Sequence, residues 1–192
     1  MTDVTAPLAK RDAAGHRPQD LPPAAPATEA EQRLIAMVEL LFFAYRDFTA
    51  EPDAILDEMG FGRAHHRVLH FVNRNPGLRV ADLLHVLRIT KQSLARVLKQ
   101  LIDDGFITQT TGPKDRRERR LHATEAGHRL AERLLTNQTR RIAAALQAAG
   151  PGAETHAEAF LLGVISAEDR DAVRRLTGPR RLSKPSQGSG DR

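Results

Sequence analysis

The fold is decided by residues 80–124, which read VADLLHVLRITKQSLARVLKQLIDDGFITQTTGPKDRRERRLHAT. Two short segments with apolar residues at helical spacing, 80–87 and 91–103, are separated by only three residues, a pattern typical of two helices that meet at an angle. Residues 106–110 then alternate in polarity like a short strand, and residues 121–123 supply a returning strand. The stretch therefore predicts a helix-turn-helix followed by a β-hairpin.

The second of these helices has two contrasting faces. Its apolar residues recur at i, i+3, i+4 and i+7 and predict one buried stripe of Leu94, Val97, Leu98 and Leu101. Thr90 is predicted to cap the helix with its hydroxyl. For the preceding helix, the pattern predicts that Ala81, Leu84 and Leu87 point inward.

The opposite face of the second helix is basic and polar. Residues 88–100 contain four bases and no acid. A helix of this width fits the major groove of DNA, where Arg pairs with guanine and Gln with adenine. We therefore expect Gln92, Ser93 and Arg96 to read bases; a solvated basic face on a structural helix is the alternative.

A second basic segment follows at the predicted hairpin tip, residues 114–120, which carries five bases and two acids. An extended arginine at such a tip can enter the narrow minor groove while its neighbours contact phosphates. A basic tip beside a basic helix favours DNA binding over a solvated face. The predicted DNA-binding residues are Arg88, Thr90, Lys91, Gln92, Ser93, Arg96, Lys99, Lys114, Asp115, Arg116 and Arg117, with Arg119 as a further phosphate contact.

These residues resemble the MarR family of bacterial regulators. The resemblance rests on Asp115-Arg116-Arg117, followed by Leu121, Thr124 and Gly127, and on Leu98, Leu101 and Gly105-Phe106-Ile107 upstream; it extends over about residues 31–176. It implies that Asp115 braces the wing arginines and that Arg117 enters the minor groove. It also implies repression as the default mode, and a small ligand bound between the dimerisation helices and the winged domain. Residues for such an effector pocket are Phe42, Tyr45, Arg46 and His66, with core packing as the alternative for the aromatic ones.

The chain departs from the family pattern beyond Gly127, where the segment up to Ser166 is longer than usual and is broken by Gly150-Pro151-Gly152. We expect a long helix over 124–149, an additional helix over 154–165 and a closing helix from Ser166. This extension and residues 65–78, HHRVLHFVNRNPGL, are similar to a PetP-type subgroup of the family.

The flanks complete a fold that is mainly α with a small β-hairpin wing: a winged helix-turn-helix domain between N- and C-terminal dimerisation helices. The helix over 29–46 is apolar over most of its circumference, which indicates burial at a subunit interface. A loop through Pro52 and Gly60 and a helix over 63–74 follow. We expect a disordered arm at 1–28, a domain at 29–177 (DNA-binding lobe 62–123, dimerisation helices 29–48 and 124–177) and a disordered basic tail at 178–192.

Composition narrows the function further. The net charge is +5, there is no cysteine, and no secretion signal or spanning helix is apparent, so we expect a cytoplasmic protein. Neither the histidines at 65, 66 and 70 nor the acids Glu51, Asp53, Asp57 and Glu58, interpreted as a solvated loop, predict a metal, cofactor or catalytic site. The expected function is a sequence-specific regulator that binds double-stranded DNA as a homodimer on a palindromic operator. The alternative is a winged-helix module that binds protein or RNA.

Overall fold

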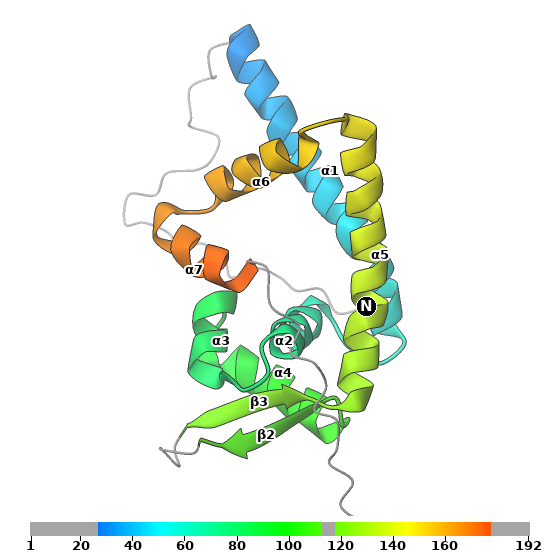
Figure 1. The fold of residues 1–192 in the computed structure, drawn as a ribbon, viewed down its shortest axis with the longest axis vertical. Coiled ribbons are helices and arrows are strands. Elements are labelled where there is room, and N and C mark those ends of the chain that lie inside the picture. Colours follow the sequence, from blue (N-terminus) through cyan, green and yellow to red (C-terminus); the bar gives the residue numbers. More distant parts are fainter. Residues whose placement is uncertain (1–26, 113–117, 178–192) are drawn as a thin grey trace, which may run out of the picture. The chain divides into compact units, whose positions relative to one another are not determined.

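The computed structural model describes residues 27–112 and 118–177. The elements in these ranges are α1 (Glu29–Asp57), α2 (Arg63–Arg74), β1 (Leu78–Arg79), α3 (Val80–Leu87), α4 (Lys91–Asp103), β2 (Ile107–Thr111), β3 (Arg119–Ala123), α5 (Glu125–Ala149), α6 (Ala153–Val164) and α7 (Ala167–Thr177). The predicted fold class, mainly helical with a small antiparallel wing, is confirmed (Figure 1). Contacts divide the chain between Phe43 and Ala44, so residues 27–43 are described as a unit by themselves.

The core of the larger unit lies between α2, α3, α4, α5 and the wing strands. The predicted stripe on α4 is confirmed, because Leu94, Val97, Leu98 and Leu101 are all buried. The wing contributes one buried side chain from each long strand, Ile107 and Leu121. Burying aliphatic side chains of this size stabilises a fold by about 1.5–3 kcal/mol each, so α4 is fixed chiefly by its apolar face.

The prediction for α3 is partly wrong. Ala81 is exposed and Leu84 is only half-buried, whereas Leu83, which was not predicted, is completely buried together with Leu87. At about 100° per residue, Leu83 and Leu87 lie on one side of the helix and Ala81 lies on the other. The packing of α3 in the core selects the side with Leu83 and Leu87.

The predicted loop through Pro52 is also wrong, because α1 runs without interruption from Glu29 to Asp57. Proline inside a helix removes a hydrogen bond and costs about 3 kcal/mol. Here Pro52 is buried, and so are Ile55 and Leu56 in the next turn. Their burial offsets the cost of proline, and the helix ends only at the turn containing Gly60, whose φ is 66°.

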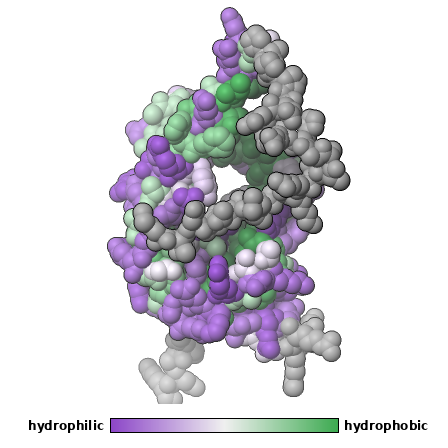
Figure 2. All heavy atoms as spheres, turned by 180° about the vertical axis from the view of Figure 1, so that it is seen from behind, coloured by the Kyte–Doolittle hydropathy of each residue, from purple (hydrophilic) through white to green (hydrophobic). Residues whose placement is uncertain are grey.

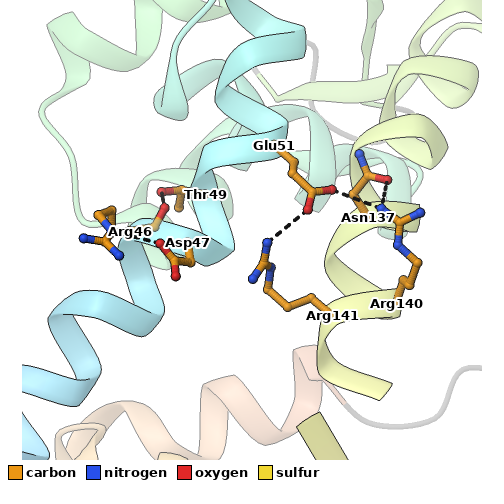
Figure 3. Close-up of polar contacts among 7 residues, drawn as sticks. All are labelled: Arg46, Asp47, Thr49, Glu51, Asn137, Arg140 and Arg141. Carbon is orange, nitrogen blue, oxygen red and sulfur yellow. Dashed lines mark hydrogen bonds and ion pairs between the residues drawn. The ribbon is translucent and has the colours of Figure 1, made fainter. Parts of the chain in front are cut away.

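Acidic residues of this last part of α1 form ion pairs and not the predicted solvated loop. The carboxylate of Glu51 accepts hydrogen bonds from Arg141 at 3.0 Å and Arg140 at 3.2 Å, both on α5 (Figure 3). Asp53 accepts a hydrogen bond from Arg63 at the start of α2, at 2.8 Å. Pairs at this level of exposure contribute little energy each, but they connect α1 to α5 and α2.

The sheet is antiparallel, with the strand order β1-β3-β2. Leu121 in the middle strand lies opposite Leu78 on one side and Gln109 on the other. Arg119 and Arg120 lie within β3, paired with Thr111 and Thr110, so their assignment to the hairpin tip is wrong. Their backbones complete the ladder of β2, which extends one residue further than predicted.

The wing is joined directly to α5. Thr124 caps α5 by accepting a hydrogen bond from the N–H of Gly127 at 3.0 Å, and its hydroxyl donates to the carbonyl of Gly105 at 2.7 Å. A Cβ on Gly127 would lie 2.1 Å from the carbonyl oxygen of Phe106. No side chain fits at that distance, so glycine allows the first turn of α5 to pack on the base of the hairpin.

The carboxyl-terminal extension forms the two predicted helices. Gly150 and Gly152, with φ values of 84° and 81°, turn the chain between α5 and α6. The Nε of Arg170 on α7 donates to the carbonyls of Leu162 at 2.9 Å and Ile165 at 3.0 Å, which closes the corner between α6 and α7. Within the described ranges, none of the helices combines the length and the apolar composition that a membrane span requires.

The amino-terminal unit is a helix with an apolar surface. Thr28 and Glu31 form a reciprocal cap, in which the N–H of Thr28 donates to the carboxylate at 2.7 Å and the N–H of Glu31 donates to the hydroxyl at 3.3 Å. Seven large hydrophobic residues of this unit are 42–69% exposed: Leu34, Ile35, Met37, Val38, Leu40, Phe42 and Phe43. The apolar circumference predicted from sequence is therefore exposed within this chain.

Candidate DNA-binding interface

The turn between α3 and α4 has a defined geometry. Arg88 has a φ of 48° and is the one described non-glycine residue in the left-handed region. Its N–H still donates to the carbonyl of Leu84 at 3.0 Å. Thr90 then begins α4 as predicted, because its hydroxyl oxygen accepts a hydrogen bond from the N–H of Ser93 at 3.1 Å. The turn and cap together fix where the first turn of α4 lies.

The exposed face of α4 brings together five of the predicted contact residues: Lys91, Gln92, Ser93, Arg96 and Lys99. All five side chains are exposed, and they point away from the buried stripe of the same helix. Figure 2 shows that hydrophilic side chains cover most of the visible surface of this lobe, at the bottom of the view. The arrangement offers hydrogen-bond donors and positive charge to a polyanion.

Two of the four basic residues at 88–100 have acidic partners. Lys99 pairs with Asp103 one turn later on α4, and this hydrogen bond raises the pKa of the Lys99 ammonium. Arg88 donates to Asp169 on α7 at 2.7 Å, and this contact raises the pKa of the guanidinium above its ordinary value. Among the described residues, Lys91 and Arg96 form no such pair, so they are the basic groups most available to a ligand.

An unpredicted contact between side chains holds α4 against α2. The ring of His65 lies 3.0 Å from Gln100 through Nε2, while Nδ1 accepts a hydrogen bond from the N–H of Gly62 at 3.0 Å. With Nδ1 as an acceptor, Nε2 carries the hydrogen that is donated to Gln100. Phe61 stacks on the ring at 4.8 Å. Burial lowers the pKa of His65, which favours this neutral form.

The wing is described on both sides of its tip. Gly112 donates a backbone hydrogen bond to Glu118 at 2.9 Å, and Glu118 also accepts from Arg120 at 2.6 Å. Arg119 is exposed and donates to the hydroxyl of Thr111 at 3.3 Å. The four wing residues predicted to contact DNA lie outside the described residues: Lys114, Asp115, Arg116 and Arg117.

A separate cavity of about 460 Å³ lies between the last part of α1, α2 and α5. Its lining is Tyr45, Phe48, Thr49, Arg63, His66, Arg67, His70, Phe71, Leu135, Gln138, Thr139, Ile142, Ala143 and Leu146. The walls are largely apolar, four side chains are bases, and none is an acid. Burial lowers the pKa of His66 and of His70. The chemistry suits a small organic molecule that is neutral or anionic.

Two of the four predicted effector residues, Tyr45 and His66, line this cavity. Arg46 is not among the lining residues and instead donates to Asp47 at 2.8 Å, while Phe42 belongs to the amino-terminal unit. Sequence reasoning missed Arg63, Arg67 and His70. Their spacing on α2, at i, i+4 and i+7 opposite the apolar stripe, was a signal that could have found them. No local signal could identify Gln138 on α5.

Comparisons with known proteins agree with this geometry. Residues 59–118 match the model of the MarR family. The HTH-type transcriptional regulator PetP of Rhodobacter capsulatus is 54% identical over 123 residues, which cover 64% of this chain and 74% of that protein. The match therefore covers most of the length of PetP.

Solved structures share the fold. A crystal structure of the transcriptional regulator SlyA has a TM-score of 0.58 at 20% identity, covering 71% of this chain and 98% of that one. A MarR-family regulator of Listeria monocytogenes, solved in complex with a 26-mer DNA, has a TM-score of 0.58 at 18% identity, covering 76% of this chain and 97% of that one. With a relative as similar as PetP, the chain is not an enzyme but a member of the MarR family of transcriptional regulators, in the PetP-type subgroup.

Proposed function

We propose that this regulator binds double-stranded DNA sequence-specifically as a homodimer and represses transcription from a palindromic operator. The observation that carries the proposal is the exposed face of α4, where Lys91, Gln92 and Arg96 stand opposite a fully buried stripe. The Listeria relative, which has the same fold, was solved with DNA. A recognition helix of this kind enters the major groove with its first turns, which here are the ones that Thr90 caps.

The residues divide into two roles. Contacts to phosphates give affinity without sequence preference, and contacts to base edges give specificity. We assign base contacts to Gln92, Ser93 and Arg96, and minor-groove insertion to Arg117 with Asp115 as its brace. The phosphate contacts are Arg88, Lys91, Lys99, Lys114 and Arg116, together with Arg119.

The homodimer is supported by apolar surface that this chain leaves exposed. Residues 27–43 carry the seven exposed hydrophobic side chains described above, and α6 adds Phe160, Leu161 and Val164. Clusters of exposed apolar side chains mark interaction sites, and twofold pairing is the commonest solution. In this proposal 29–177 form the domain, with 62–123 as the lobe that binds DNA, while 1–28 and 178–192 are tails. Action on the chromosome places the protein in the cytoplasm.

The cavity between α1, α2 and α5 supports regulation by a small-molecule effector. Its apolar walls accept a hydrophobic body, while Arg63, Arg67 and the two histidines favour a polar or anionic group at the rim. Arg63 is partly engaged, since it donates to Asp53 at 2.8 Å and its guanidinium lies 5.2 Å from the Tyr45 ring. Because α5 and α2 both line the cavity, an occupant would bias their relative positions.

The test is a fluorescence-anisotropy titration with DNA from upstream of the protein's own gene, against a scrambled duplex, at several salt concentrations. A specific regulator retains its preference for the upstream DNA, and its affinity falls steeply with salt because counterions are released. The Arg117→Ala variant is expected to bind more weakly. Arg129→Ala, which removes an arginine paired with Glu125 on α5, is the control and should bind as the parent protein does.

The alternative functions predict other outcomes. A protein-interaction module gives weak binding to both duplexes with little dependence on salt, and an RNA-binding module prefers a structured RNA of the same length. Equal affinity for the upstream and scrambled duplexes would contradict sequence-specific binding. Arg117→Ala binding as tightly as the parent protein would contradict the wing assignment.

A further inference from the structure

The closing helix α7 has little to hold it in place. None of its residues is buried. Two arginine contacts fix its first turn: Arg170 donates to carbonyls at the end of α6, and Arg88 reaches it from the helix-turn-helix. Figure 1 shows the start of the helix-turn-helix, α3, next to α7. The contact with Arg88 spans 81 positions of the sequence.

The contact places two acidic side chains, Glu168 and Asp169, against Arg88, a basic residue of the proposed DNA-binding face. One terminal nitrogen of Arg88 lies 2.7 Å from Asp169 and 3.6 Å from Glu168. Ser166 donates its hydroxyl to Asp169 at 2.9 Å, which orients the carboxylate, and this bond together with Arg88 lowers the pKa of Asp169. The Asp169 carboxylate is therefore ionised at neutral pH and positioned to hold the guanidinium.

Arg88 is suited to exchange partners. It lies between α3 and α4, two positions before the cap of α4, and its side chain remains more than half exposed. A DNA phosphate offers the same guanidinium two acceptor oxygens in the bidentate geometry that arginine favours. Phosphate and the α7 carboxylates therefore compete for one group, and the carboxylates also repel the DNA backbone.

We propose that α7 is an autoinhibitory element, in which Glu168 and Asp169 compete with DNA phosphate for Arg88 and so lower the affinity of the helix-turn-helix for DNA. This inference rests on the proposed DNA-binding function and adds a mode of regulation to it. When DNA binds, Arg88 turns to phosphate, and α7 stays attached to α6 through Arg170, which also donates to the carbonyl of Gly163 at 2.9 Å.

The contact is weak enough to be exchanged. Ion pairs at this level of exposure contribute little to stability, so DNA can displace the carboxylates. Once Arg88 has left, the Arg170 contacts alone hold the first turn of α7, and the helix opens more readily. Any partner that moves α6 also moves α7, because the Arg170 contacts bind the two helices at their corner. The carboxyl-terminal helices can thereby pass a change at the subunit interface to the DNA-binding face.

The test compares two substitutions that each remove one negative charge from α7. Asp169→Asn removes the negative charge that faces Arg88 but keeps an oxygen that accepts the hydrogen bond from Ser166. Asp171→Asn is the matched control, since Asp171 lies 3.5 Å from Arg174 and pairs within α7. Affinity for the upstream duplex is measured by anisotropy at low salt. Asp169→Asn is expected to raise affinity by about two- to fivefold, and Asp171→Asn by much less.

The Arg88→Gln background completes the cycle, because Asp169→Asn should no longer raise affinity once Arg88 is absent. Equal gains from Asp169→Asn and Asp171→Asn, or a gain that persists with Arg88→Gln, would overturn the proposal and leave DNA binding intact. Absence of salt-dependent binding by the parent protein would instead overturn the proposed function, and this inference with it.

A second measurement does not depend on affinity. Amide hydrogen exchange of residues 167–177 reports whether α7 is released. Exchange should accelerate when the upstream duplex is added to the parent protein, and Asp169→Asn should show the faster exchange even without DNA. Unchanged exchange on addition of saturating DNA would also overturn the proposal.

Discussion

The amino-terminal unit and the helix-turn-helix lobe use apolar residues in opposite ways. On α4 the apolar side chains form one stripe, all of it buried, and the remaining surface is polar and basic. In residues 27–43 the large apolar side chains are exposed within this chain. The core of the lobe is therefore formed within a single copy, whereas the apolar side chains of the amino-terminal unit stay exposed in it and are the surface that we propose a second copy covers. DNA binding and dimerisation are assigned to the two kinds of surface.

The largest expected effect separates the two regions by one substitution made in each. Leu101→Ala removes a completely buried side chain of α4 and should lower the free energy of unfolding by about 2–5 kcal/mol. Leu40→Ala, at a side chain that is 60% exposed, should act only through dimerisation. Urea denaturation at several protein concentrations tests this, because only the Leu40→Ala effect should vary with concentration. If both variants lost the same free energy of unfolding at every protein concentration, the proposed difference between the two regions would be wrong.

A charge on the apolar surface of the amino-terminal unit should separate the subunits. Phe42→Glu places a carboxylate where a dimer would bury an aromatic ring, and we expect about 2–3 kcal/mol weaker association. Sedimentation equilibrium measures the dissociation constant. Gln32→Glu adds the same charge at an exposed polar position of the same helix and should leave the dimer intact. A Phe42→Glu protein that sediments as the parent does would remove the amino-terminal unit from the interface.

Within the lobe, two substitutions on the polar face of α4 should differ in kind. Arg96→Ala should weaken binding to the upstream duplex by about 1–3 kcal/mol and relax the preference for one base pair. Lys91→Ala should weaken binding to all sequences alike and reduce the dependence on salt. Anisotropy against a panel of single-base variants distinguishes them. If both substitutions acted uniformly, base reading by Arg96 would be ruled out.

The smallest expected effect is a dependence of the stability of the lobe on pH. Burial lowers the pKa values of His65, His66 and His70 on α2, so the unfolded chain binds protons more readily. The folded state holds these histidines in the neutral form. The stability that depends on this form is fully present above the unfolded pKa near 6.5, and it is lost as pH falls below that value. Urea midpoints at pH 7.5, 6.5 and 5.5 should decrease in that order. His70→Gln should reduce the decrease, whereas the exposed His156→Gln should not.

The residues that sequence reasoning placed correctly are those with a local signal. Helical spacing predicted the stripe of α4, and the hydroxyl of Thr90 at a helix start predicted its cap. The prediction for α3 failed because a helix of eight residues offers two similar apolar faces, and only the tertiary fold selects Leu83. The loop at Pro52 failed because burial outweighs a local preference.

Neither helical spacing nor capping could predict contacts between distant parts of the chain. Arg88 and Asp169 are 81 positions apart, and His65 and Gln100 are 35 apart, so neither pair follows from periodicity or capping. Arg88 was predicted as a phosphate contact from its charge alone. The structure adds the carboxylates that hold this base, which only the arrangement of α7 reveals.

The close fit of Gly127 under the Phe106 carbonyl has a mechanical consequence. With no linker and no room for slippage, the wing and α5 form one stiff lever. The 25 residues of α5 span about 37 Å at the usual helical rise, so a tilt of about 5° at the far end would swing the hairpin by about 3 Å. We expect a displacement of that size to weaken the proposed contact between the wing and the minor groove.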